Sequence, residues 1–262
     1  MDAGSLSAVD WSQPWFGAVA ALRGGVATRE PIVQLTRRAA ERNVTTASGW
    51  PIEFVAADDA PAGRAYESHI AATGRVPTRL NRHDLFNALA WLAFPRTKAR
   101  LNALHAAAIE RDGIGGRRGP LRDAATLFDE NGALLVTADP VLPALLRERR
   151  WKAAFVEHRD IWDSVRVLVF GHALMDKLVA PYKSITAHAL VVELRADTPQ
   201  AEVDARLARR LDENFDTSAF LPLPVLGVPG WSRSASPIDY DDTAVFRPLR
   251  AGQRTREECS TS

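Results

Sequence analysis

The chain has 262 residues, 46% hydrophobic and 25% charged, a composition typical of a folded protein with one large core or two closely fused lobes. Its 33 Lys and Arg residues against 32 Asp and Glu residues give a net charge of +1, which excludes a surface that attracts nucleic acid or anionic lipid as a whole. The only cysteine, Cys259, excludes an intramolecular disulfide and a multi-cysteine zinc site, and favours a reducing, cytoplasmic location. No apolar run approaches the roughly 18 residues of a membrane span.

The first third of the chain is predicted to be mainly helical. Helices are expected over residues 14–24, 31–42 and 66–73. The first of them is short and has apolar residues on one face, which indicates a core helix rather than an export signal. Residues 50–63 contain two prolines and an acidic pair and are expected to be irregular, and Gly74 and Pro77 mark a turn.

The clearest helical pattern covers residues 82–94. Asn81 is a suitable N-cap and Asp84 follows three positions later, an arrangement similar to a capping box. Three leucines then make an apolar stripe. A second helix is expected over 97–111, ending at the glycine-rich segment 113–120. The short connection predicts that the two helices pack against each other.

The second half of the chain is predicted to mix strands with helices. Apolar runs over 125–128 and 133–137 flank the segment 129–132 (DENG), and Asn-Gly between two such runs predicts a β-hairpin. Further helices are expected over 140–150, 172–180 and 198–215, a strand over 165–170, a strand or a helix over 184–194, and extended chain over 221–231.

Together these patterns predict an α+β fold. We expect a single compact domain over residues 11–250, with a helical first third followed by a small mixed sheet with flanking helices. Residues 251–262 are predicted to be a disordered polar tail. No GxGxxG segment follows a predicted strand, which excludes a Rossmann dinucleotide fingerprint.

Two polar groups lie on the adjacent helices. His83, Asp84 and Asn87 have helical spacing and are able to ligate a metal or to hold a general base. Ordinary helix-start chemistry is the alternative, because a carboxylate favours the positive end of the helix dipole. Lys98, Asn102 and His105 share one face of the next helix, which either approaches the first group or is solvated.

The glycine-rich segment carries a possible anion site. Glycines allow backbone N–H groups to approach an anion, and Arg117, Arg118 and Arg122 offer bidentate contacts to phosphate or carboxylate. The Walker Lys-Ser/Thr ending is missing, so a nucleotide-binding P-loop is not supported. A connector with solvated arginines is the alternative. Asp129 and Glu130 are possible carboxylate bases, although a hairpin turn explains them equally well.

A last polar group follows the predicted strand 165–170. His172 and Asp176 are four residues apart on a helix, which suits metal binding or orientation of an imidazole by a carboxylate. Lys177 and Lys183 are nearby cations. His172 as a buried structural histidine is the alternative, and His188, inside an apolar segment, is predicted to belong to the core.

Several motifs, taken together in their order and spacing, resemble a bacterial family known as domain of unknown function 3025. These motifs are HDLFNALAWLAFPRTKARLN, RGPLRDAATLFDENGALL, FGHALMDKL with APYKSITAHA, and LPVLGVPGW with YDDTAVFRP. The resemblance covers roughly residues 11–250 and implies one family-defining domain. It implies no activity, cofactor or catalytic residues, and the chain departs from the family pattern at WSRSASPIDYDD.

The leading functional hypothesis is a metal-assisted hydrolase acting on a phosphorylated or other anionic substrate, with a divalent metal as the cofactor. The predicted site residues are His83, Asp84 and His172 as metal ligands, Asp129, Glu130 and Lys177 as catalytic groups, and Asn87, Arg118, Arg122, Asp123 and Lys183 as ligand-binding groups. The alternatives are a non-catalytic binder of an anionic small molecule or nucleic acid, and a structural or partner-binding domain with a buried ion network. No membrane partner is expected, and the sequence leaves the oligomeric state open.

Overall fold

Helices and two small sheets make up the part of the chain that the computed structural model describes, which is residues 8–25, 30–59, 63, 65–113, 119–231 and 240–249. The strands are β1 (Glu53–Ala56), β2 (Arg75–Thr78), β3 (Gly132–Val136), β4 (Arg166–Val169), β5 (Thr186–Val192) and β6 (Leu221–Pro224). The α-helices are α1 (Pro31–Glu41), α2 (Tyr66–Thr73), α3 (Arg82–Ala93), α4 (Pro95–Asp112), α5 (Pro120–Asn131), α6 (Val141–Arg147), α7 (His172–Lys177) and α8 (Gln200–Arg210). Short 3₁₀ helices are η2 (Pro14–Phe16), η3 (Ala20–Gly25), η4 (Ala57–Asp59), η6 (Arg159–Ser164), η7 (Thr217–Ala219) and η8 (Val225–Gly227), and η5 (Ala153–Glu157) is a π-helical turn.

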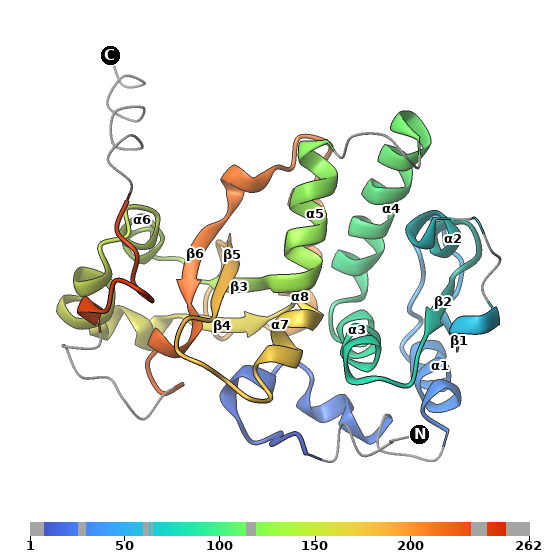
Figure 1. The fold of residues 1–262 in the computed structure, drawn as a ribbon, viewed down its shortest axis with the longest axis horizontal. Helices are drawn as coiled ribbons and strands as arrows, with labels where there is room; N and C mark the ends of the chain where they lie inside the picture. Colours follow the sequence, from blue (N-terminus) through green and yellow to red (C-terminus); the bar gives the residue numbers. More distant parts are fainter. Residues whose placement is uncertain are drawn as a thin grey trace.

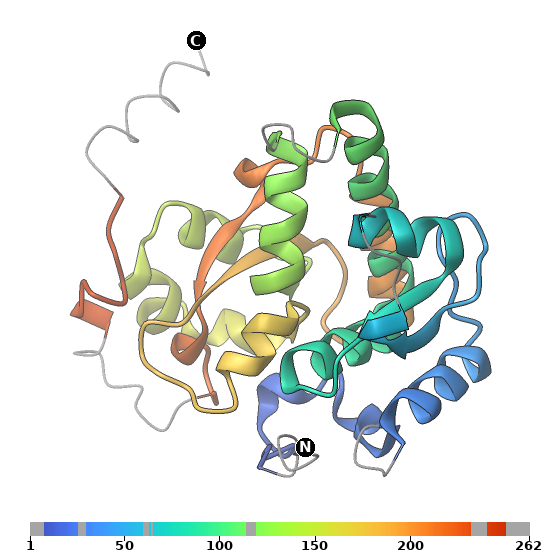
Figure 2. The same cartoon turned by 45° about the vertical axis from the view of Figure 1, so that its right-hand side comes forward.

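The two sheets lie on opposite sides of the molecule (Figure 1). The larger sheet has the strand order β4-β3-β5-β6, in which β3 is antiparallel to β4 and parallel to β5, and β5 is antiparallel to β6. The smaller sheet pairs β1 with β2 in parallel. Helices α3 and α4 lie between the side that carries α1, α2 and the small sheet and the side that carries α5, α7 and the large sheet (Figures 1 and 2). The predicted α+β class is confirmed.

The buried apolar side chains form one contiguous cluster that spans both sides. It includes Phe16, Trp91, Phe128 and Phe155, each at most 1% exposed. Phe16 stacks on Phe86 at 5.7 Å and Phe128 stacks on Phe170 at 4.6 Å between ring centroids. Such ring pairs add to the free energy gained by removing apolar area from water.

The predicted hairpin around residues 129–132 is wrong. Residues 125–128 belong to α5, whose buried positions Leu121, Ala124, Ala125 and Phe128 are spaced three and four apart and so share one helix face. Gly132 ends the helix with an extended backbone, φ −76° and ψ 148°, and the chain continues directly into β3. The Asn-Gly pair therefore marks the end of a helix and not a turn between two strands.

The first third is less regular than predicted. Residues 14–24 form two 3₁₀ helices, η2 and η3, in place of one α-helix. The segment 50–63, expected to be irregular, contains β1, and β2 lies where a turn was expected at Gly74 and Pro77. Gly74 does adopt a left-handed conformation at the end of α2, with φ 72°, so the turn precedes the strand.

The remaining predicted elements agree with the structure apart from their ends. Residues 184–194 contain a strand, β5, and not a helix. The helices predicted over 172–180 and 198–215 are shorter than expected, ending at Lys177 and Arg210. The segment 221–231, expected to be extended, contributes β6 to the edge of the large sheet.

Candidate metal centre

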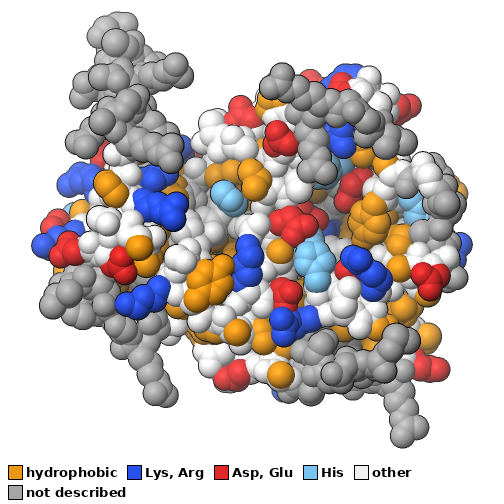
Figure 3. Space-filling model, viewed as in Figure 1, with side chains coloured by type: hydrophobic (Ala, Val, Ile, Leu, Met, Phe, Trp, Pro, Cys, Tyr) orange, Lys and Arg blue, Asp and Glu red, His pale blue; other side chains and the backbone are white. Residues whose placement is uncertain are grey.

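Three helix ends meet on the face of the molecule shown in Figure 3, where acidic, basic and histidine side chains gather near the middle. They are the first turn of α3, the last turn of α5 and the first residue of α7. Asn81 caps α3, because its side-chain oxygen accepts a hydrogen bond from the Asp84 amide at 2.8 Å. This cap places His83 in the half-buried first turn of α3, opposite α7.

Gly171 allows α7 to lie against the junction of α5 and β3. A Cβ atom at this position would lie 2.5 Å from the carbonyl oxygen of Glu130 and 2.5 Å from the amide nitrogen of Gly132. The Gly171 amide donates a hydrogen bond to the Gly132 carbonyl at 2.9 Å. Because only glycine permits this approach, the next residue, His172, begins its helix beside Glu130.

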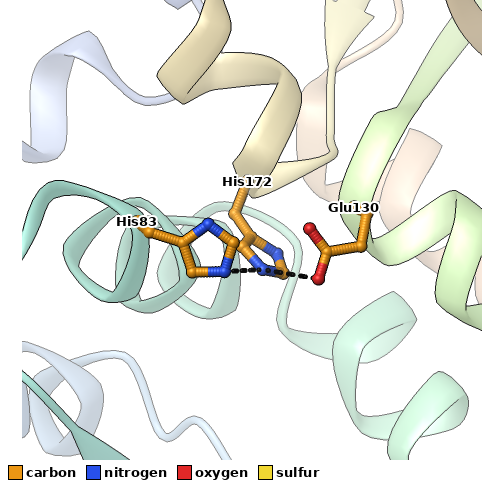
Figure 4. A group of neighbouring side chains, drawn as sticks. All are labelled: His83, Glu130 and His172. Atoms are coloured by element: carbon orange, nitrogen blue, oxygen red, sulfur yellow. Dashed lines mark hydrogen bonds and ion pairs between the residues drawn. The ribbon is translucent and has the colours of Figure 1, made fainter.

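The side chains of His83, Glu130 and His172 point toward one another from the three helix ends (Figure 4). His172 Nε2 lies 3.1 Å from His83 Nε2 and 3.5 Å from Glu130 Oε1. One ligand atom from each residue lies within 4.8 Å of the other two. His172 is 5% exposed, whereas His83 and Glu130 are half-buried.

This arrangement fits a small divalent cation. Two imidazole nitrogens and one carboxylate oxygen are the donor set of many catalytic zinc sites, in which water or substrate takes the fourth position. With metal–ligand bonds of 2.0–2.2 Å, neighbouring ligand atoms of a tetrahedron lie about 3.4 Å apart. The two distances around His172 Nε2, 3.1 and 3.5 Å, lie on either side of that value.

A carboxylate lies behind the buried histidine. Asp129 Oδ2 is 3.7 Å from His172 Nδ1, an ion-pair distance that is too long for a hydrogen bond. The other oxygen, Asp129 Oδ1, accepts a hydrogen bond from Lys98 Nζ at 2.5 Å, and Lys98 also donates to Asn87 Oδ1 at 2.8 Å. Metal-binding histidines commonly present the second ring nitrogen to a carboxylate, which fixes the tautomer. Asp129 has this position.

Both carboxylates are held in the charged form. Burial by itself would raise the pKa of Asp129, but the positive charge of Lys98 and the nearby His172 outweigh it, so that this pKa lies below its usual value. Hydrogen bonding to His172 lowers the pKa of Glu130. Glu130 is therefore ionised at neutral pH, as a metal ligand must be.

A cavity of about 260 Å³ adjoins the two carboxylates. Tyr66, His105 and Arg122 contribute to its wall together with Asp129 and Glu130. The Nη1 atom of Arg122 is buried and has no hydrogen-bond partner among the described residues. Arg122 thus combines a place in the cavity wall with an unsatisfied buried donor, and guanidinium groups bind carboxylates and phosphates.

The face of α4 that carries Lys98, Asn102 and His105 is buried and not solvated. These three side chains are 5%, 3% and 8% exposed. Asn102 Nδ2 donates to the Glu67 carboxylate at 2.6 Å. The packing of α3 against α4 brings Lys98 to Asn87, which is one of the two arrangements that the helical spacing left open.

Other predicted ligands have partners elsewhere. Asp84 lies outside the cluster, because its carboxylate accepts hydrogen bonds from the Arg79 amide at 2.8 Å and from the Arg79 guanidinium at 3.0 and 3.1 Å. Asp176 pairs with Arg82. His188, which was predicted to belong to the core, is half-buried on β5 and packs against Phe220, with ring centroids 5.3 Å apart. Glu130 supplies the third donor in place of the expected Asp84.

The predicted cations and ligand-binding groups divide among several places. Lys177 Nζ donates to Asn131 Oδ1 at 2.6 Å. Asp123 and Lys183 are exposed, and neither lines the cavity described above. Arg117 and Arg118 lie outside the described residues. Of the predicted anion-binding groups, Asn87 and Arg122 are therefore the ones that the structure places near His172 and its carboxylates.

Sequence reasoning missed Tyr66 and misread the local structure of Glu130. The Tyr66 hydroxyl accepts a hydrogen bond from Asn87 Nδ2 at 3.2 Å and extends the network around Lys98. No spacing pattern singles out a tyrosine on a separate short helix. Glu130 was expected in a hairpin turn, and the helical period of residues 121–128 is the signal that places it at a helix end instead.

Comparisons with known proteins identify the family. No curated protein and no solved structure matches the chain. Within the part of the chain that the structure describes, no helix is both long enough and apolar enough to cross a membrane. A sequence model of the family described as "Protein of unknown function (DUF3025)" matches residues 52–250, which is most of the chain. The chain therefore belongs to the DUF3025 family.

Proposed function

We propose that this protein is a metal-dependent hydrolase that acts on a phosphorylated or other anionic substrate. The observation that carries the proposal is the convergence of His83, Glu130 and His172 on one point, with Asp129 behind His172. Since His83 and Glu130 are only half-buried, a bound ion would retain an open position toward solvent.

The bound ion, Asp129 and Arg122 each have a separate role in the proposed reaction. A bound divalent ion lowers the pKa of water and stabilises negative charge on a substrate oxygen. Asp129 faces Nδ1 of His172 at an ion-pair distance of 3.7 Å, so we assign it a positioning role in place of the base expected from the sequence. Arg122 lies at the wall of the adjacent cavity, where its free N–H group would bind an anionic substrate.

A purely structural role is the competing proposal, because Lys98 and Asp129 form a largely buried ion pair. In that case the two imidazoles and Glu130 would be joined by a hydrogen-bonding proton in place of a metal ion. The two proposals differ in what they predict for metal binding. Structural histidines would show no stoichiometric affinity for a divalent ion.

The first test is metal binding by the purified full chain after treatment with a chelator. We expect calorimetry to show one site per chain when Zn²⁺, Mn²⁺ and, without oxygen, Fe²⁺ are added in separate titrations. His83→Ala should weaken binding by more than the roughly 10–100-fold typical of losing an outer-shell partner, and Asp129→Asn should fall within that range. His158→Ala, at an exposed histidine, is the matched control.

The second test is activity. The metal-loaded chain should hydrolyse 4-nitrophenyl phosphate, and both His83→Ala and chelation should abolish the reaction while His158→Ala leaves it unchanged. Absence of a stoichiometric ion, or equal affinity in His83→Ala and the wild type, would refute the metal centre. Metal binding without hydrolysis of phosphate or carboxylate esters would refute the hydrolase assignment alone.

A further inference from the structure

A second cavity, of about 500 Å³, lies beside the large sheet. It is bounded by the end of α5, by α7, by β5 and β6, and by the C-terminal residues 244–247. None of His83, Glu130 and His172 lines it. Its volume is within the roughly 300–1,000 Å³ typical of small-molecule sites. We propose that this cavity binds a small organic anion, a carboxylate or a phosphate ester with an apolar body.

The described charged residues of the cavity wall are all basic. Lys177, Arg149 and Arg247 contribute to it, and no described residue in the wall is an aspartate or a glutamate. The chain as a whole has almost equal numbers of basic and acidic residues, so three cations with no acidic residue described in the same wall are a local departure from its composition. Such a wall has a positive potential that favours an anion.

Lys177 is held in position but not saturated. Its ammonium group donates one hydrogen bond to Asn131 Oδ1 at 2.6 Å. An ammonium group has three donors, so two have no partner among the described residues and are open to a ligand. The Asn131 contact, between two residues of the wall, restrains the Lys177 side chain, which reduces the entropy lost when an anion binds.

Arg149 has a backbone conformation that non-glycine residues rarely adopt. Its φ is 53°, in the left-handed region. The residue ends the turn after α6, where its amide donates to the Leu146 carbonyl at 3.1 Å. Strained conformations of this kind are often retained at binding sites, and here the conformation belongs to a cation of the cavity wall.

Other residues of the wall are aromatic or carry hydroxyl groups. Trp151 and Phe220 supply flat apolar surfaces, and Tyr182, Thr186 and Thr217 carry hydroxyl groups. The Trp151 indole N–H donates to the Arg247 carbonyl at 3.0 Å, which fixes the C-terminal segment at the rim. A ligand with both an apolar body and a charged group matches this wall better than inorganic phosphate does.

The test uses 1-naphthoate and 1-naphthyl phosphate as probes and the neutral 1-naphthalenemethanol as their comparison. Binding is measured by calorimetry on the full chain in the presence of a chelator, so the outcome does not depend on the proposed metal centre. We expect at least one anionic probe to bind tenfold or more tightly than the neutral alcohol. If 1-naphthoate binds more tightly, a carboxylate is the preferred group. If 1-naphthyl phosphate binds more tightly, the preferred group is a phosphate.

Variants locate the site. Lys177→Met should weaken the anionic probe about tenfold, the effect of losing one charged hydrogen bond. Lys152→Met removes the same charge from an exposed lysine outside the cavity wall and should leave affinity unchanged. Arg247→Met should reproduce the loss, and supplies the result if Lys177→Met does not fold. Equal binding of the neutral alcohol, or full affinity in both Lys177→Met and Arg247→Met, would overturn the proposal.

Discussion

Lys98 shows how much a single buried charge depends on its partners. Its side chain is 5% exposed, its ammonium group contacts Asn87 and Asp129, and it lies 5.5 Å from the centre of the Trp91 ring. Taking an ammonium ion out of water costs several kcal/mol, which is offset only while these contacts persist. The residue therefore supports the position of Asp129 behind His172.

We expect Lys98→Met to lower the free energy of unfolding by about 3–5 kcal/mol, because Asp129 would remain buried without its cation. Urea denaturation followed by circular dichroism measures the change. Lys152→Met, at an exposed lysine, should change stability by less than about 0.5 kcal/mol. The double variant Lys98→Met with Asp129→Leu should recover part of the loss, and a single-variant loss below about 1 kcal/mol would contradict the argument.

At the same scale, the sequence identified His83 and His172 as potential ligands but did not show that they meet. Residue type and helical spacing are local properties, whereas the 3.1 Å approach of the two rings depends on the packing of α3 against α7. Asp84 was chosen because it adjoins His83. The structure shows that Asp84 binds Arg79 instead. The capping pattern concerns only Asn81 and Asp84, so it did not predict this contact.

Among the secondary-structure elements, the contact between α7 and the α5–β3 junction determines the geometry of the candidate metal centre. We expect Gly171→Ala to force these elements apart, because its methyl group would lie 2.5 Å from backbone atoms of Glu130 and Gly132. The variant should lose about 1–3 kcal/mol of stability and bind Zn²⁺ more weakly than the wild type. Thermal melting and calorimetry measure the two effects.

Gly119→Ala is the matched control for this prediction. Gly119 precedes α5 with an ordinary φ of −81°, and no described atom lies within 4 Å of a Cβ built there. Gly119 is the N-cap of α5, where alanine is less favourable than glycine but also restricts the unfolded chain, so the replacement should change stability by less than about 1 kcal/mol. Equal effects of the two substitutions would show that close approach at Gly171 is not what places His172.

Helix α5 also explains one limit of sequence reasoning. The Asn-Gly pair is a strong hairpin signal when strands lie on both sides, and the run 125–128 was short enough to be read as a strand. Phe128 and the alanines before it pack as one helix face only in the presence of Phe170 and Phe215. These partners come from distant parts of the chain, so the local sequence did not decide between helix and strand.

At the scale of the whole molecule, residues 240–249 pack back onto aromatic residues from the middle of the chain. The Phe246 ring lies 5.0 Å from Tyr240, 5.9 Å from Phe155 and 6.0 Å from Trp151. Phe246→Ala should therefore lower the free energy of unfolding by about 3–5 kcal/mol through the lost contacts and the cavity left behind. It should also weaken the anionic naphthyl probe, because Arg247 is the next residue.

Leu80→Ala, at a leucine that is 53% exposed, is the control and should change stability by less than about 0.5 kcal/mol. Denaturant unfolding measures both variants. A Phe246→Ala chain as stable as the Leu80→Ala chain would mean that residues 240–249 contribute little to the core.

The α+β class followed from the sequence because it depends on the alternation of element types, which local periodicity reports. The parallel pairing of β1 with β2 was not predicted from the sequence, because each strand has only four residues and β2 contains Pro77, which is unusual in a strand. The boundaries predicted for a single domain, 11–250, stay a prediction. The connection of Arg247 to Trp151 was also not foreseen, because nothing near either residue in the sequence indicates it.

The three side chains of the candidate metal centre come from segments that are far apart along the chain. An ion held by His83, Glu130 and His172 would therefore act as a reversible cross-link that closes two long loops of the polypeptide. Because the unfolded chain has no such site, an ion at about 100 times its dissociation constant would add roughly 2.7 kcal/mol to the free energy of unfolding. Under the proposed function, the persistence of the fold in the cell would then follow the local supply of the ion.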